Sequence, residues 1–190
     1  MNPIRAAVVT VSDTGYTGQR EDVSGPLLAR LLRDMGAEVV RQAIVPDERD
    51  EIVRLLVTLS DQVSGEMASE GLAFGEGVSE EAAVDLVVTT GGTGVTPRDV
   101  TPEATKAVIQ REMPGLAEAL RFTGYHKTPM AVISRGVAGI RGRTLIVNLP
   151  GSPNAVRDGM ETLAPILPHA IQMIQGQDTE HDREEASASA

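Results

Sequence analysis

Residues 85–103 read DLVVTTGGTGVTPRDVTPE, and this stretch decides the fold. A short, mostly apolar run over residues 84–90 leads into a glycine-rich turn, as expected for a strand that is buried on both faces. Thr101 then stands where a helix N-cap is expected, with Pro102 in the first turn and Glu103 favourable to the helix dipole. The stretch therefore predicts a strand, a loop and a helix in succession, which is the repeating unit of a parallel sheet.

The same alternation of strand and helix patterns continues along the chain. Further strands are expected over residues 6–11, 39–45, 129–134 and 144–149. Further helices are expected to begin at Ser24, Asp47, Met113 and Ser152. This alternation predicts an α/β fold with a doubly wound, mostly parallel sheet that carries helices on both faces. Because ligands of such sheets bind beyond the carboxyl ends of the strands, we expect the functional residues in the loops that follow the strands.

Composition limits both the domain count and the kind of partner. The chain has 190 residues, of which 41% are hydrophobic, and no cysteine. This length and composition predict a single domain over residues 1–175 and exclude disulfides and thiolate metal sites. The net charge of −10 argues against nucleic acid, which needs a basic face. No apolar run is long enough to span a bilayer, and no secretory segment opens the chain, so we expect a cytoplasmic protein without a membrane partner.

The negative charge gathers in two segments that are poor in bulky apolar residues. Residues 64–82 carry five acidic side chains and no basic one, and residues 176–190 carry five acidic side chains and one arginine. Such composition cannot offset the entropy of ordering. We therefore expect a flexible acidic insertion and a disordered acidic tail, and the tail has the alternative role of docking a partner.

The glycine-rich loop after residue 90 is the first candidate binding element. Glycines let backbone N–H groups approach an anion, so Gly91, Gly92, Thr93 and Gly94 together with the helix start at Thr101 predict a phosphate site. The spacing matches neither of the common nucleotide-binding motifs, GxxxxGK[ST] and GxGxxG. The alternative is an ordinary strand-to-helix turn.

Two carboxylates are expected at the same edge of the sheet. Asp47 follows the second strand and Asp99 follows the glycine loop. Paired carboxylates can hold Mg²⁺ while substrate phosphates complete its coordination shell, or they can accept N–H groups of a heterocycle. The alternative is structural: Asp47 caps its helix and Asp99 pairs with Arg98.

Three further loops complete the expected rim. Ser12, Asp13 and Ser24 come after the first strand. The turn Pro150–Gly151–Ser152 precedes a helix and is another potential anion site. Ser134 and Arg135 open an arginine-rich loop that also holds Arg141 and Arg143, and guanidinium groups bind phosphate with two hydrogen bonds. The alternative for this cluster is a solvated surface.

Taken together, these segments resemble the MogA/MoaB family of molybdenum-cofactor biosynthesis and the related G domain of gephyrin. The resemblance covers about residues 5–175 and is most specific in the long glycine loop. The matching motifs are TVSD (10–13), DVSGP (22–26), VPDE (45–48), TTGGTGVTPRDVTPEAT (89–105), MPGLAEALR (113–121), SRGVAGIRG (134–142) and NLPGSPNAV (148–156). The long loop and the aspartate of VPDE are similar to the adenylyltransferase branch of the family.

The resemblance implies an activity and two catalytic residues. The activity is molybdopterin adenylyl transfer, in which AMP passes from Mg²⁺–ATP to the terminal phosphate of molybdopterin and pyrophosphate is released. The essential aspartates of the family match Asp47 and Asp99, which would also hold the Mg²⁺. A homotrimer is implied, and the molybdenum-insertion protein is a candidate partner. Two alternatives stay open: a molybdopterin-binding scaffold without catalysis, and a nucleotide-phosphate hydrolase in which water attacks.

Overall fold

The computed structural model describes residues 3–61 and 83–176 of the chain. The acidic insertion predicted over residues 64–82 lies outside the described residues. The acidic tail predicted over residues 176–190 also lies outside them, apart from Gly176. Within the described ranges, no helix has the length and hydropathy needed to cross a bilayer.

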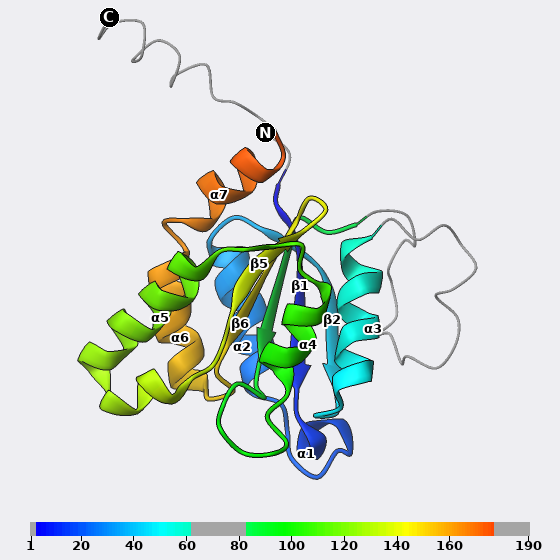
Figure 1. Ribbon diagram of the computed structural model, residues 1–190, viewed down its shortest axis with the longest axis vertical. Helices are drawn as coiled ribbons and strands as arrows, with labels where there is room; N and C mark the ends of the chain where they lie inside the picture. The colour runs from blue at the N-terminus through cyan, green and yellow to red at the C-terminus, as the bar shows by residue number, and fades with distance from the viewer. Residues whose placement is uncertain (1–2, 62–82, 177–190) are drawn as a thin grey trace, which may run out of the picture.

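A single mixed sheet with helices on both faces forms the described part of the chain (Figure 1). Its strands are β1 (Arg5–Val11), β2 (Glu38–Val45), β3 (Leu86–Thr90), β4 (Arg111–Glu112), β5 (Ala138–Arg141) and β6 (Thr144–Leu149). The helices are α1 (Asp13–Tyr16), α2 (Ser24–Asp34), α3 (Arg49–Ser60), α4 (Thr101–Val108), α5 (Pro114–Lys127), α6 (Pro153–Leu163) and α7 (Leu167–Ile174), with a 3₁₀ helix η1 (Pro129–Ile133).

The strand order is β2-β1-β3-β6-β5-β4. β2, β1, β3 and β6 run parallel, whereas β5 is antiparallel to both of its neighbours, β6 and β4. The predicted doubly wound, mostly parallel sheet is therefore confirmed. Thr90 at the end of β3 pairs with Thr10 on one side and with Leu149 on the other. Because these residues are level, the loops that follow β1, β3 and β6 begin side by side.

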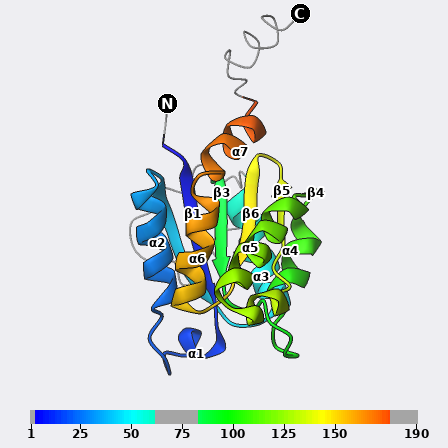
Figure 2. The ribbon, with the colours of Figure 1, turned by 90° about the vertical axis from the view of Figure 1, so that its left-hand side faces the viewer.

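Two hydrophobic cores hold the helices against the sheet, one on each face (Figure 2). On one face, α2, α5, α6 and α7 cover side chains that include Val8, Val88 and Val147. On the other face, α3 and α4 cover side chains that include Val9 and Val87. The central strands are buried on both sides, which explains why they read as continuous apolar runs rather than alternating ones.

The strand predicted over residues 129–134 is wrong, because this segment forms η1. The place next to β6 belongs instead to β5, whose small residues Ala138 and Gly139 the apolar pattern did not reveal. Met130 and Val132 in η1 are exposed, whereas strands beside β6 are buried. A short apolar run does not by itself distinguish a strand from another element, and tertiary pairing decided this one.

The start of α2 also differs from the sequence prediction. Ser24 was expected as the N-cap, but the capping carboxylate is that of Asp22, which accepts the Gly25 N–H at 2.9 Å. The Ser24 hydroxyl instead donates to the Gly151 carbonyl at 2.6 Å. The helix start is thereby tied to the loop that follows β6.

Candidate active site

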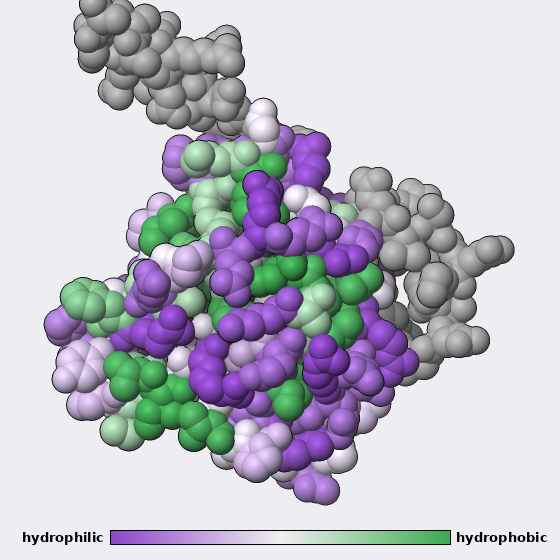
Figure 3. All heavy atoms as spheres, in the orientation of Figure 1, coloured by the Kyte–Doolittle hydropathy of each residue, from purple (hydrophilic) through white to green (hydrophobic). Residues whose placement is uncertain are grey.

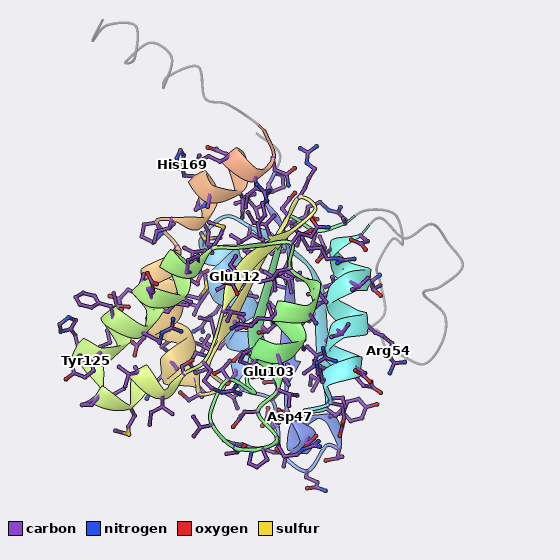
Figure 4. The ribbon with its side chains drawn as sticks, viewed as in Figure 1. Asp47, Arg54, Glu103, Glu112, Tyr125 and His169 are labelled. Atoms are coloured by element: carbon purple, nitrogen blue, oxygen red, sulfur yellow. The ribbon has the colours of Figure 1, made fainter. Side chains whose placement is uncertain are left out.

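A cleft of about 980 Å³ opens at the carboxyl edge of the parallel strands. One wall consists of the loops that follow β1, β2, β3 and β6, and the other consists of α5, η1 and the start of α6. Most of the predicted site residues line it: Ser12, Ser24, Asp47, Gly91, Gly92, Thr93, Gly94, Asp99, Ser134, Pro150, Gly151 and Ser152. In Figure 4, Asp47 lies at this end of the molecule with Glu103 of α4 nearby, and His169 of α7 lies at the opposite end.

The glycine loop is packed against its neighbours so tightly that side chains are excluded. Gly91 has φ +108°, and a Cβ there would come within 2.2 Å of the Val11 carbonyl oxygen. Gly92 has φ +61°, and its Cβ would come within 2.3 Å of the Thr101 hydroxyl oxygen. Both conformations favour glycine, and a larger residue would have to displace the Val11 backbone at Gly91 or the Thr101 hydroxyl at Gly92.

The hydrogen bonds of this loop show which N–H groups remain for an anion. The Gly91 N–H donates to the Leu149 carbonyl at 3.0 Å. Thr101 is buried and closes the loop, because its N–H donates to the Gly92 carbonyl at 3.1 Å and its hydroxyl donates to the Gly91 carbonyl at 2.9 Å. Within residues 3–61 and 83–176, the N–H groups of Gly92 and Thr93 have no hydrogen-bond partner. These two are the amides that the loop offers to a phosphate.

Asp47 is held by the loop that follows β1. Its Oδ2 accepts the Asp13 N–H at 2.9 Å, and its own N–H donates to Asp13 Oδ1 at 2.9 Å. Its other oxygen, Oδ1, faces the glycine loop, since a Cβ on Gly92 would lie 3.1 Å from it. Burial raises the pKa of Asp47, as do the charges of Asp13 and Asp99, which outweigh the hydrogen bond from Asp13 and the charge of Arg98. The alternative that Asp47 caps α3 is wrong, because Glu48 occupies the N-cap position.

Asp99 is held by its own turn. Its Oδ2 accepts the Thr96 N–H at 2.8 Å and the Thr96 hydroxyl at 2.6 Å. Burial acts to raise the pKa of Asp99, but hydrogen bonds from Thr96 and Gly94 and the charge of Arg135 outweigh it, so the pKa lies below its ordinary value. The cleft thus holds one carboxylate that is electrostatically disfavoured, Asp47, and one that is stabilised, Asp99.

Arg98 does not pair with Asp99, contrary to the structural alternative. Its guanidinium group binds both carboxylate oxygens of Asp13 at 2.9–3.1 Å and Glu48 at 2.8 Å. These hydrogen bonds raise the pKa of Arg98. Asp13 lies behind the cleft rather than in its lining, where it connects Arg98 to the backbone of Asp47.

Arg135 also supports the glycine loop from outside the cleft lining. Its Nε donates to the Gly94 carbonyl at 2.6 Å and its Nη2 donates to the Asp99 carbonyl at 2.6 Å. Its Nη1 forms an ion pair with Glu103, and this hydrogen bond lowers the pKa of Glu103. The predicted arginine cluster is divided, because Arg141 pairs with Asp61 and Arg143 with Gln175.

The wall formed by α5, η1 and α6 was not predicted from the residues. It contributes Arg121, Thr123, Gly124, Met130, Ile133 and Asp158 to the lining. Only the resemblance offered a signal for it, because the motif MPGLAEALR ends at Arg121. Next to this wall, Figure 3 shows hydrophobic side chains gathered over the outer end of α5 and over η1, where Phe122 and Met130 are exposed.

The fold and the cleft together define an α/β protein with an open cleft at the carboxyl edge of a parallel sheet, in which two unpartnered backbone amides lie in the same lining as a pair of aspartates. The family model described as "Probable molybdopterin binding domain" matches residues 7–66 and 69–169, and the chain belongs to that family.

Individual relatives agree with this assignment. The chain is 38% identical over 178 residues to a molybdopterin adenylyltransferase of Helicobacter pylori J99, and the match covers 93% of this chain and 90% of that protein. It is 33% identical over 190 residues to the molybdopterin adenylyltransferase of Escherichia coli K12, with 93% and 88% covered. Among solved structures, the molybdopterin biosynthesis enzyme MoaB of Thermus thermophilus has a TM-score of 0.75 at 44% identity, and the match covers 91% of this chain and 97% of that one.

Proposed function

We propose that this protein is a molybdopterin adenylyltransferase, which transfers AMP from ATP to the terminal phosphate of molybdopterin and releases pyrophosphate. The observation that carries the proposal is the meeting of Asp47, Asp99 and the open amides of Gly92 and Thr93 in one cleft. The names of the close relatives support the same activity.

The chemistry of the step fits the residues of the cleft. A phosphate oxygen of molybdopterin attacks the α-phosphorus of ATP, the bond from that phosphorus to the bridging oxygen breaks, and pyrophosphate leaves. The attacking oxygen is already anionic near neutral pH, so no strong general base is needed. The protein has to align two anionic reactants and offset their charge. Amides of the glycine loop and of the Pro150–Gly151–Ser152 turn bind phosphate groups in this proposal.

The residues of the cleft also fit a Mg²⁺ ion. Within the described ranges there is no group of three or more His, Cys, Asp or Glu side chains that could hold a metal by itself. Mg²⁺ ordinarily uses one or two carboxylates together with substrate phosphates and water. Asp47 Oδ1, which accepts no hydrogen bond from the described residues, and the Asp99 carboxylate would be those ligands. The ion would supply charge neutralisation at the phosphates.

The remaining predicted residues take supporting roles. Ser12, Ser24 and Ser134 line the cleft, and Ser134 Oγ lies 3.4 Å from Thr93 Oγ1 of the glycine loop. Asp13, Thr101 and Arg135 position the loops from behind. A homotrimer and delivery of the product to a molybdenum-insertion protein belong to this proposal, and sedimentation of the purified protein tests the trimer. Cytoplasmic localisation stays a prediction.

The test is release of pyrophosphate from ATP in the presence of molybdopterin, for the wild type and for Asp99→Asn. We expect release that depends on molybdopterin and is lost in the variant. An exposed substitution on α2, Arg30→Gln, serves as the matched control and should retain the activity.

Two results would replace the proposal. Tight binding of molybdopterin without any release of pyrophosphate identifies a scaffold. Hydrolysis of ATP at the full rate without molybdopterin identifies a phosphate hydrolase.

A further inference from the structure

Arg121 of α5 lines the same cleft as the two aspartates. The residue is half-buried, and its Nη1 donates to the carbonyl oxygens of Gly136 at 2.9 Å and of Ser134 at 3.4 Å. Two acceptors on one nitrogen hold the guanidinium group in place at the wall, so little side-chain entropy remains to be lost when a ligand binds.

Within the described residues, the charge of Arg121 is not paired with a carboxylate, unlike the charges of the arginines that surround the glycine loop. Arg98 is paired with Asp13 and Glu48, and Arg135 is paired with Glu103. In the part of the chain that the structure describes, no carboxylate pairs with Arg121, and its Nε and Nη2 donate to no protein group. A guanidinium group with two free nitrogens, Nε and Nη2, is suited to a phosphate oxygen pair.

Arg20 is the other arginine that lines the cleft, and it is less suited to this role. It lies in the loop between α1 and α2, and its side chain is exposed. No hydrogen bond to the described residues holds that side chain, whereas two carbonyl groups hold Arg121. Ordering a free arginine side chain on a ligand costs rotamer entropy, and Arg121 avoids part of this cost.

The segment that holds Arg121 touches the glycine loop. Ser134 Oγ lies 3.4 Å from Thr93 Oγ1, and the Arg135 N–H donates to the Thr93 carbonyl at 2.8 Å. A phosphate on the open amides of Gly92 and Thr93 therefore lies on the side of the cleft to which Arg121 is fixed. The open backbone amides and the Arg121 guanidinium group would then bind the same anion.

We propose that Arg121 is the cationic ligand of a phosphate group bound in the cleft, in the role that the sequence suggested for Arg135. The inference rests on the proposed function, in which both substrates carry phosphate. The ligand class is a nucleotide polyphosphate or pyrophosphate, which share the chemistry that the guanidinium group recognises.

The test measures binding to the full-length protein by calorimetry with ATP, inorganic pyrophosphate and adenosine. Arg121→Gln removes the charge and keeps an uncharged amide on a shorter side chain. We expect it to weaken ATP, pyrophosphate or both by about tenfold or more, since a charged hydrogen bond contributes that much. Adenosine, which has no phosphate, should bind equally well. Arg121→Lys, which keeps the charge without the fork, should lose less, and Arg30→Gln should bind all three ligands like the wild type.

The inference is overturned if Arg121→Gln binds ATP and pyrophosphate as tightly as the wild type. It is also overturned if adenosine loses the same factor, because that indicates a structural role. Should Arg121→Gln not fold, the same criteria apply to Arg121→Lys. The outcome is separate from that of the proposed function: a wild type that releases no pyrophosphate refutes the activity, whereas the binding series refutes or supports Arg121 alone.

Discussion

Asp13 and Asp47 each accept a hydrogen bond from the backbone N–H of the other, and both hydrogen bonds measure 2.9 Å. The exchange joins the loop after β1 to the loop after β2. Arg98, which comes from the glycine loop, binds the same Asp13 carboxylate with two nitrogens. Three loops are thereby fixed around a single side chain, and the Asp47 carboxylate gains its position from residues that do not line the cleft.

Removal of the Asp13 carboxylate should therefore reduce turnover. We expect Asp13→Ala to lower kcat by about tenfold to a hundredfold, as is usual when a group that orients a site ligand is lost. The KM for ATP should change little, because Asp13 does not line the cleft. Asp13→Asn keeps an acceptor for the Asp47 N–H and should lose less. Steady-state kinetics decide the matter, and full activity of Asp13→Ala would refute the positioning role.

The two aspartates should have opposite effects on stability. Burial raises the pKa of Asp47, so its ionisation destabilises the fold progressively as the pH rises from the unfolded pKa to the folded pKa, and the full loss is present above the folded pKa. Asp47→Asn should raise Tm at pH 7 by about 2 °C, and this gain should vanish below about pH 4, where the acid is protonated in both states.

The pKa of Asp99 is lowered, so its stabilisation is present above the unfolded pKa and is lost as the pH falls through the folded pKa. Asp99→Asn should therefore lower Tm at pH 7.

Thermal melts from about pH 3.5 to pH 7 in the presence of EDTA check both variants across the range in which carboxylates titrate. The same sign for the two substitutions at pH 7 would contradict the electrostatic assignment.

Gly92 should not tolerate substitution, because its positive φ disfavours other residues and its surroundings leave no room for a Cβ atom. Gly142 provides a matched control, since its φ is +55° against +61° for Gly92, but no atom lies within 4 Å of its Cβ position. Gly142→Ala should cost about 1–2 kcal/mol of stability from the angle alone. Gly92→Ala should cost more and abolish activity, because its Cβ displaces the Thr101 hydroxyl and crowds Asp47. Denaturant unfolding measures both, and equal costs would show that crowding is absent.

Arg135 should matter for stability where Arg121 does not. The Arg135 guanidinium group donates to the carbonyls of Gly94 and Asp99, and Arg135→Gln, whose amide nitrogen reaches only the Nε position, leaves the Asp99 carbonyl unsatisfied. We expect a loss of about 1–3 kcal/mol in the free energy of unfolding and a lower kcat. Arg121→Gln should unfold close to the wild type. Chemical denaturation of the two variants side by side tests the contrast, and a larger loss for Arg121→Gln would reverse the two roles.

The central part of the fold could be predicted from the sequence because its signals are local. Residues 86–90 form an apolar run that a glycine turn ends, and β3 is found there. The edge of the sheet could not be predicted in the same way. β5 consists of AGIR and owes its strand conformation to pairing with β6, while the more apolar run at residues 129–133 forms a 3₁₀ helix.

The same difference applies to the candidate site: residues that follow strands could be predicted, and contacts that depend on the tertiary fold could not. Asp47 and the glycine loop follow strands, and chain order alone placed them at one edge. The partner of Arg135 could not be read from the sequence, because Glu103 lies 32 residues away and nothing local joins them. Arg121 could not be predicted because it lies within α5, whereas the sequence pattern pointed to the loops that follow strands. The sequence shows where the arginines are, but the carboxylates that pair with them lie at distant positions and meet them only in the tertiary fold.

β1, β3 and β6 end in register with one another, and this alignment limits where residues can be inserted into the chain. One residue added to any of these strands would advance its loop by about 3.3 Å and take Thr10, Thr90 or Leu149 out of alignment. Residues added at the opposite edge would leave that alignment intact. The described residues Leu59 of α3 and Val84 before β3 meet at that edge, where the Val84 N–H donates to the Leu59 carbonyl at 3.0 Å. Extra residues are therefore expected to disturb the site less where the parallel strands begin than where they end.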